Sequence, residues 1–194
     1  MTSRRWCAGI AVAGAAALAG CHYDPYPWPR PGQPSATPLE NQLSQRDSLQ
    51  DAANDLIAVA KEIREAVQRV YPGAQWSAVT HGGQAGCDPP FTFLTGTVYQ
   101  LPHYSTPAPT SPADREAVVA AAADVLRARH ADNIDEAKGQ SVSGQLPRDH
   151  GLPRLTIGTP AAPARPLITV EGQTGCHHTA PGPGPWDTAP TPTP

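Results

Sequence analysis

Four cysteines have the widest range of chemistry in this sequence of 194 residues: Cys7, Cys21, Cys87 and Cys176. A cysteine thiol can attack an electrophile, bind a metal ion or form a disulfide, and the redox state of its compartment decides between these roles. The last two cysteines close matching pentapeptides, Gly-Gln-Ala-Gly-Cys at 83–87 and Gly-Gln-Thr-Gly-Cys at 172–176. Their chemistry depends on where the protein resides, which the N-terminus indicates.

The first 20 residues are typical of a secretory signal peptide. Arg4 and Arg5 supply the positive charge with which such peptides begin. An uncharged stretch of mainly Ala, Val, Ile, Leu and Gly runs from Cys7 to Leu18. It is shorter than the roughly 20 residues that a membrane-spanning helix needs. We expect the general secretory route rather than the twin-arginine route, because Cys7 fits the twin-arginine pattern poorly.

The signal peptide ends in Leu18-Ala19-Gly20-Cys21, which resembles the bacterial lipobox. A lipobox implies cleavage between Gly20 and Cys21 and a thioether-linked diacylglycerol on Cys21, often with a further N-acyl chain such as palmitate. Two or more acyl chains give stable anchoring, at about 0.8 kcal/mol per buried methylene. We therefore predict a lipoprotein on the extracytoplasmic face of the cell membrane. The alternative is an ordinary cleavage site that happens to precede a cysteine.

The charge balance of the mature chain limits its partners. The full sequence has a formal net charge of −3, and residues 1–20 contain two arginines and no acidic residue, so the mature chain carries −5. A chain of this charge has no electrostatic attraction for nucleic acid or for anionic lipid headgroups. We expect no nucleic-acid partner, and contact with the membrane through the lipid anchor alone.

Removal of Cys7 with the signal peptide and lipidation of Cys21 leave one pair of thiols, Cys87 and Cys176. Outside the cytoplasmic membrane thiols are normally oxidised. We therefore predict a disulfide between Cys87 and Cys176. Closure of a loop of about 90 residues stabilises a fold by roughly 4 to 5 kcal/mol in the chain-entropy model.

The alternative for this pair is a zinc site in which it joins His81, His177 and His178. Thiolate and imidazole are the ligands that zinc prefers. Adjacent residues seldom all reach one metal, however, and an oxidising compartment removes the thiolates. We favour the disulfide and expect no metal and no other cofactor.

Two further groups of polar residues have spacings that chemistry could use. Asp47, Asp51 and Asp55 would line one helix face and could bind a cation or a basic partner, but a solvated outer face is favoured. Asp149 and His150 adjoin a glycine-containing turn, where a surface histidine is favoured over a general base. Nucleophile-elbow, Ser-Xaa-Xaa-Lys, metalloprotease and phosphate-loop motifs are lacking. We therefore expect no catalytic residue, with an unrecognised envelope hydrolase as the alternative.

Two helices are predicted to support these residues. Thr37-Pro38-Leu39-Glu40 is typical of a helix start, and Tyr71-Pro72-Gly73 of its end. Between them an apolar stripe recurs every three or four positions: Leu49, Ala52, Leu56, Val59, Ile63, Val67 and Val70. A second helix is predicted from Ser111-Pro112 to 127–130, with an inner face formed by Val118, Val119, Ala122, Val125 and Leu126.

Five stretches rich in β-branched and aromatic residues predict strands, at 75–80, 91–100, 140–146, 152–158 and 167–173. A loop at 82–90 separates the first two, a polar connection follows the second helix, and 147–151 forms a turn. This order predicts an α+β domain. We expect an antiparallel sheet of four to five strands, covered on one face by two helices, with disordered proline-rich flanks.

Proline-rich segments flank the domain, and 24 prolines and 17 glycines make up about a fifth of the chain. Residues 21–37 are predicted to be an extended tether of ~3.1 Å per residue, and residues 38–178 the α+β lipoprotein domain. Residues 179–194 are predicted to be a disordered tail. Three threonines of the tail resemble O-mannosylated tracts of exported actinobacterial proteins, and an unmodified tail is an equal alternative: Thr188, Thr191 and Thr193.

Several motifs together point to one family. They are the lipobox, the two matching pentapeptides, and the segment from Leu155-Thr156-Ile157-Gly158 to Thr174-Gly175-Cys176-His177. On these motifs the chain resembles the LppA-like lipoproteins of mycobacteria and related actinobacteria, over roughly residues 40–178. The resemblance implies a lipid-anchored envelope protein with two paired cysteines and no assigned activity.

These observations favour a non-catalytic binding or accessory module of the mycobacterial cell envelope. Its partner would be an envelope protein, a lipid or a peptide, and an envelope enzyme with a site assembled from scattered residues is the alternative. A concave apolar pocket with a few polar groups would favour ligand binding. A buried acid or histidine pair in a cleft would favour catalysis, and a flat polar surface would favour protein contact.

Overall fold

The computed structural model describes residues 37–92, 94–158, 166–182 and 184–185. The predicted signal peptide, the cleavage site between Gly20 and Cys21, the lipid on Cys21, the tether up to residue 36 and most of the tail lie outside these residues. In the described part of the chain, every helix is too short or too polar to cross a membrane.

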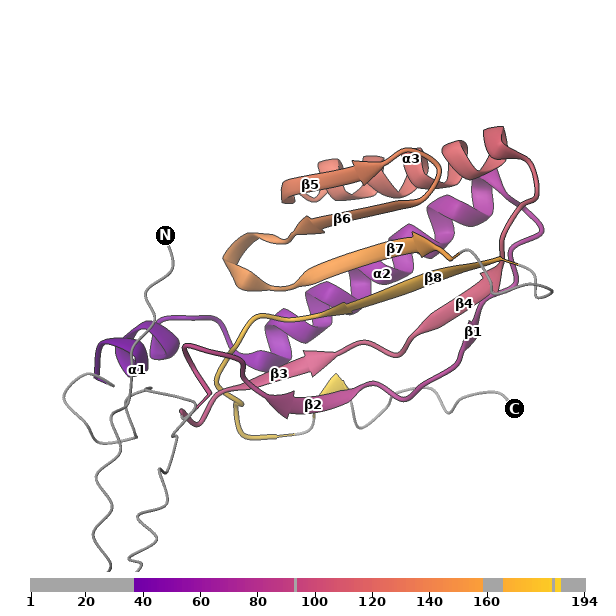
Figure 1. Cartoon of the computed structure of the whole chain (residues 1–194). Helices are drawn as coiled ribbons and strands as arrows, with labels where there is room; N and C mark the ends of the chain where they lie inside the picture. Colours follow the sequence, from indigo (N-terminus) through magenta and orange to yellow (C-terminus); the bar gives the residue numbers. More distant parts are fainter. Residues whose placement is uncertain (1–36, 93, 159–165, 183, 186–194) are drawn as a thin grey trace, which may run out of the picture.

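The described residues form three α-helices and an eight-stranded antiparallel sheet (Figure 1). The helices are α1 (Thr37–Ser44), α2 (Leu49–Val70) and α3 (Pro112–Ala128). The strands are β1 (Ser77–Ala78), β2 (Gly83–Gly86), β3 (Thr97–Gln100), β4 (Tyr104–Pro107), β5 (Asp132–Ala137), β6 (Ser141–Gln145), β7 (Leu152–Ile157) and β8 (Leu167–Gln173). The predicted α+β class is confirmed, and the sheet has more strands than the four to five expected.

The strands follow the order β1-β4-β8-β7-β6-β5, and β2 joins the sheet through β3, which pairs with β8. Sequence patterns missed β2, β4 and β5, so the loop predicted at 82–90 and the polar connection after the second helix were wrong. β2 and β4 have four residues each, and β5 is an edge strand with three acidic residues. Such segments become strands through pairing with their neighbours rather than through their own propensity.

The single helix predicted from Thr37 to Val70 was also wrong, because it is interrupted between α1 and α2. Ser48 caps α2: its hydroxyl accepts a hydrogen bond of 3.2 Å from the backbone N–H of Asp51. The Leu49 backbone N–H donates to the His178 carbonyl at 2.9 Å. The interruption lets the connection between the helices contact the segment after β8.

Helices α2 and α3 pack together against one face of the sheet (Figure 1). On β8, Ile168 and Val170 are fully buried on the helix side, and Thr169 and Glu171 alternate with them. Nearly all of the predicted helix stripes are buried, and Val70, the last residue of α2, is 47% exposed. The prediction that helices cover one face is confirmed, and the opposite face of β7 and β8 carries polar residues.

Candidate functional site

Cys87 and Cys176 form the predicted disulfide, with Cα atoms 5.5 Å apart. The bond joins the residue after β2 to the segment that follows β8. Both cysteines are buried in a second, smaller apolar cluster with Leu43 of α1, Phe91 and Val98. The disulfide therefore forms the centre of a separate small core, and α1 packs on it.

The matching pentapeptides lie on the two sides of β3. Gly83 pairs with Gln100 in the β2–β3 ladder, and Gln173 pairs with the same Gln100 from β8. Both neighbours run antiparallel to β3, so they run parallel to each other and reach the same end of it. The repeated spacing from glycine to cysteine thus brings both sulfurs to one point.

Gly96 lies beneath this disulfide, directly before β3. A Cβ atom at this position would overlap the Cys176 sulfur and would lie 3.0 Å from the Cys87 sulfur. It would also lie 3.1 Å from a methyl group of Leu43. The sulfurs occupy the space of a side chain, so only glycine fits here.

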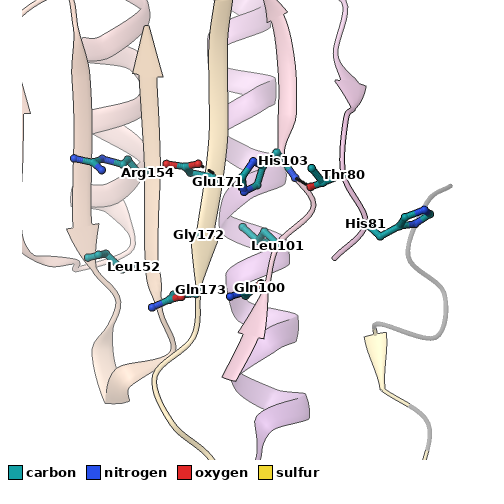
Figure 2. A pocket seen from close by; sticks show the side chains of 10 residues that line it. All are labelled: Thr80, His81, Gln100, Leu101, His103, Leu152, Arg154, Glu171, Gly172 and Gln173. Carbon is teal, nitrogen blue, oxygen red and sulfur yellow. Dashed lines mark hydrogen bonds and ion pairs between the residues drawn. The ribbon is translucent and has the colours of Figure 1, made fainter. Parts of the chain in front are cut away.

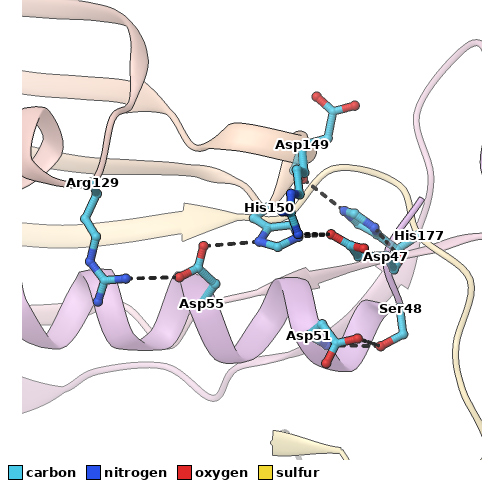
Figure 3. A network of polar contacts seen from close by, with 9 residues as sticks. Asp47, Ser48, Asp51, Asp55, Arg129, Asp149, His150 and His177 are labelled. Atoms are coloured by element: carbon cyan, nitrogen blue, oxygen red, sulfur yellow. Dashed lines mark hydrogen bonds and ion pairs between the residues drawn. The ribbon is translucent and has the colours of Figure 1, made fainter. Parts of the chain in front are cut away.

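A polar cluster near the disulfide joins segments that are far apart in the sequence (Figure 3). His150 Nε2 lies 2.8 Å from Asp47 Oδ2, and His150 Nδ1 lies 3.1 Å from Asp55 Oδ2. Each ring nitrogen of His150 therefore faces a carboxylate oxygen, which can accept a hydrogen bond. The His150 side chain is 12% exposed. The prediction of a surface histidine was therefore wrong. The predicted solvated face holds for the exposed Asp51, whereas Asp47 and Asp55 are 36% and 32% exposed and contact His150.

His177 is the second histidine of this cluster and is fully buried. Its Nδ1 lies 2.9 Å from the Asp47 carbonyl oxygen, and its Nε2 lies 2.9 Å from the Asp149 carbonyl oxygen. The His150 and His177 rings approach edge-on, with centroids 6.0 Å apart. We call Asp47, Asp55, Asp149, His150 and His177 the histidine cluster. It ties the α1–α2 connection to the β6–β7 turn and to the chain after β8.

The β6–β7 turn requires such support because its backbone is strained. Arg148 and Asp149 have φ angles of 58° and 59°, which residues other than glycine seldom adopt. The Asp149 carbonyl accepts hydrogen bonds from His177 and from the Gly175 backbone N–H, the latter at 2.8 Å. Arg46 forms an ion pair of 2.8 Å with the Asp149 carboxylate and donates to the Cys176 carbonyl at 3.0 Å. The turn is thus held by contacts on both its backbone and its side chains.

Charged partners shift the pKa of two carboxyl groups on this side of α2. The hydrogen bond from His150 is the main cause that lowers the pKa of Asp47 below its ordinary value, and partial burial opposes it. The hydrogen bonds from Arg129 likewise lower the pKa of Glu62. Arg129 also lies 3.3 Å from Asp55, so α3 is linked to the histidine cluster. These carboxylates stabilise the fold in their ionised forms.

The residues of the zinc alternative are held apart or are already bonded. The disulfide uses both thiols, and the two ring nitrogens of His177 face carbonyl oxygens. His81 lines a groove on the open face of the sheet, away from these residues. Among the residues that the structure describes, no three His, Cys, Asp or Glu side chains form a group that could hold a metal ion.

This groove has a volume of about 430 Å³ and lies across β7, β8 and the corner between β3 and β4 (Figure 2). Ten residues from four segments line it: Thr80, His81, Gln100, Leu101, His103, Leu152, Arg154, Glu171, Gly172 and Gln173. Of these, sequence reasoning named His81 as a candidate metal ligand, and Gly172 and Gln173 only as part of a matching pentapeptide. The only available signal was the outward-facing polar positions of β7 and β8, which any solvated sheet face would also show.

Polar groups of the groove form two rows across the strands (Figure 2). In the first row Arg154 lies opposite Glu171 in the β7–β8 register, and His103 Nε2 lies 3.7 Å from Glu171 Oε2. In the second row Gln173 lies opposite Gln100. Leu152 is level with Gln173 in the register and is 47% exposed, whereas Leu101 is 2% exposed and belongs to the main core. The arrangement suits a ligand that is partly apolar and forms several hydrogen bonds.

Comparison with known families places the whole of this architecture in one of them. The model of the LppA family, described as a lipoprotein confined to pathogenic Mycobacterium, matches residues 24–179. The chain belongs to this family. The resemblance noted from the motifs is confirmed. As an LppA-family member, the chain is an exported lipoprotein associated with the membrane.

The disulfide, the histidine cluster and the groove all lie within the residues that the LppA model matches. No curated protein matches this LppA-family chain. Among solved structures, a DUF4853 family protein from Actinomyces odontolyticus is similar at 12% sequence identity. The similarity covers 74% of this chain and 75% of that chain, with a TM-score of 0.46.

Proposed function

We propose that this LppA-family lipoprotein is a non-catalytic binding module of the cell envelope, anchored through lipid on Cys21 at the extracytoplasmic face of the membrane. The groove on the open sheet face is its ligand site. The observation that carries the proposal is a groove of about 430 Å³ whose lining combines the exposed amides of Gln100 and Gln173 with the exposed side chain of Leu152. A concave site with a few converging polar groups is the usual form of a ligand site.

The alternative, an envelope enzyme, would draw on the histidine cluster, because it combines buried histidines with acidic residues. Both ring nitrogens of His150 contact carboxylates and both ring nitrogens of His177 contact carbonyl oxygens. A general base needs a ring nitrogen within reach of a substrate proton. None of the cluster's residues lines the groove. The cluster is therefore better explained as a structural tie.

The anchor and the tether fit a binding role. A Pro-rich segment of about 16 residues at ~3.1 Å per residue spans up to about 50 Å. The domain can then reach ligands or partners in the envelope at some distance from the lipid headgroups. Replacement Cys21→Ala tests the anchor: the variant should leave the membrane fraction or accumulate unprocessed. Its recovery at mature size in the membrane fraction, with unchanged yield, would contradict lipidation.

Photocrosslinking in intact cells tests the groove as the binding site. A photoreactive amino acid replaces Leu152 or Gln173 in the groove, and in the control it replaces Lys61 on α2, whose side chain is 68% exposed. We expect discrete adducts from the two groove positions and not from position 61. Adducts of equal yield at all three positions, or at none, would refute a ligand site in the groove.

A further inference from the structure

Strand β2 forms an edge of the sheet. Within the described residues β2 pairs with β3 alone, and β3 joins the rest of the sheet through β8 (Figure 1). The side chain of Gln84 is exposed, and Gly83 and Gly86 have no side chain. An edge strand presents N–H and C=O groups to which a strand of another chain can bond.

The backbone groups of Gln84 and Gly86 point away from the sheet. On β3, the backbone N–H groups of Thr97 and Leu101 donate to β8 and to the segment that follows it. Backbone groups alternate in direction along a strand, so the alternate residues of β3 bond to β2, opposite its first and third residues. The N–H and C=O groups of Gln84 and Gly86 therefore face outward. Within the described residues, no other group binds them.

The matching pentapeptide on β8 shows how such an edge is filled. Its second residue, Gln173, lies opposite a residue of β7, and its fourth residue, Gly175, donates its backbone N–H to the Asp149 carbonyl at 2.8 Å. A Cβ atom on Gly175 would lie 2.7 Å from the same oxygen. The second and fourth residues of the pentapeptide on β2 are Gln84 and Gly86, and among the described residues a Cβ atom on Gly86 would meet nothing within 4 Å. The space that β7 and the β6–β7 turn fill beside β8 is thus open beside β2.

The charges of the two sheet edges favour a second copy of this chain as the neighbour of β2. A two-fold axis places an antiparallel strand beside β2, and β7 is likewise antiparallel to β8. From Ser77 to Cys87 the sequence contains no Asp, Glu, Lys or Arg, so this edge does not repel an identical one. The opposite edge, β5, carries three acidic residues, which repel an identical strand: Asp132, Asp135 and Glu136.

We propose that two copies of this lipoprotein pair through their β2 strands about a two-fold axis, so that the sheet continues from one copy into the other. The outward backbone groups of Gln84 and Gly86 bond to β2 of the second copy. Because β2 has four residues, the contact is weaker than that of a permanent dimer. Anchoring to one membrane confines the copies and raises their effective concentration. The pairing goes beyond the proposed ligand site and does not depend on it.

Photocrosslinking in intact cells identifies the neighbour of β2. A photoreactive amino acid replaces Gln84, and in the control it replaces Asp135 on the opposite edge, which is also exposed. We expect an adduct of twice the chain mass from position 84, linked to residues 82–88 of a second copy, and none from position 135. An adduct with another protein, a link to residues 21–36 or 186–194 of the same chain, or the absence of any adduct would overturn the inference.

Energy transfer between donor-labelled and acceptor-labelled copies of the mature lipidated chain in phosphatidylcholine vesicles measures the association. Gln84→Pro removes an outward N–H group and no hydrogen bond to β3, and it should weaken association at least about tenfold. Gln84→Lys and Gln84→Glu should each weaken association, and an equimolar mixture of the two should restore it. Gln68→Lys and Gln68→Glu, at an exposed position of α2, are the matched controls and should have no effect.

Each variant is checked for an unchanged melting profile. Wild-type transfer no greater than that of copies mixed at random in the bilayer would overturn the pairing. Association that Gln84→Pro leaves unchanged, or that the mixture of the lysine and glutamate variants does not restore, would show that another surface joins the copies and would also overturn it.

Discussion

Removal of the disulfide is the most informative perturbation of this fold. Cys87 and Cys176 are separated by 89 residues, and the chain-entropy relation for such a loop gives about 4.6 kcal/mol at room temperature. Both cysteines are buried among apolar side chains, so alanine is a better replacement than serine, which would bury a hydroxyl group. We expect the double variant Cys87→Ala/Cys176→Ala to lose roughly 2 to 5 kcal/mol of the free energy of unfolding.

A loss of this size is a large part of the 5–15 kcal/mol that typically separates folded from unfolded domains. Urea denaturation of the mature chain measures it, with the oxidised wild type as reference. The urea dependence should become steeper in the variant, because an unfolded chain without the bond exposes more surface. A loss below about 1 kcal/mol with an unchanged slope would refute the argument that this bond restrains the unfolded chain.

Gly96 provides an internal check on the same reasoning. Gly96→Ala places a methyl group against both sulfurs, and overpacking of this kind costs about 1–3 kcal/mol. In the background without sulfur atoms, the same substitution should cost clearly less, because Cys→Ala removes the sulfurs and leaves space for a methyl group. A double-mutant cycle measures this coupling. An equal cost in both backgrounds would show that the sulfurs are not what excludes a side chain at this position.

Three further predictions concern polar side chains that stabilise the fold. His177→Ala should lower the free energy of unfolding, measured by urea denaturation, by about 2–4 kcal/mol, because it opens a cavity and leaves the Asp47 carbonyl without its donor. The control His178→Ala, at an exposed position, should change it by less than about 0.5 kcal/mol. The pKa values of Asp47 and Glu62 are lowered from ordinary values of 3.8 and 4.5. Their contribution to the free energy of unfolding is therefore present above these values and is lost as the pH falls through the lowered pKa values. In the variant Asp47→Asn with Glu62→Gln, the free energy of unfolding should depend less on pH below about pH 4. Burial raises the pKa of Tyr99 from 10.0 to about 12, so the free energy of unfolding should fall as the pH rises across this interval. In a titration followed by ultraviolet absorbance, the phenol that ionises last should be absent in Tyr99→Phe.

The histidine cluster shows why part of the candidate site could not be predicted from the sequence. His150 contacts Asp47 and Asp55 across separations of 103 and 95 residues. A helical pattern places Asp47, Asp51 and Asp55 on one face, but it does not show what that face meets. The interruption separates the three residues further, since Asp51 lies in the first turn of α2 against its cap Ser48, and Asp47 lies outside the helix. The groove was missed for the same reason, because its lining comes from four separate segments.

Local patterns alone determined the α+β class, the start of α3, the apolar stripes of α2 and α3, and the pairing of Cys87 with Cys176. Helix periods and caps depend on neighbouring residues, and the disulfide followed from a count of two thiols after the export signal. Only the tertiary structure decided that β2, β4 and β5 are strands, that α1 and α2 are separate, and that His150 is enclosed by carboxylates. Each of these depends on hydrogen bonds or ion pairs to another segment, which is nearby in the chain for β2 and β5 and distant for the others. Their energy is gained only when the fold brings the segments together.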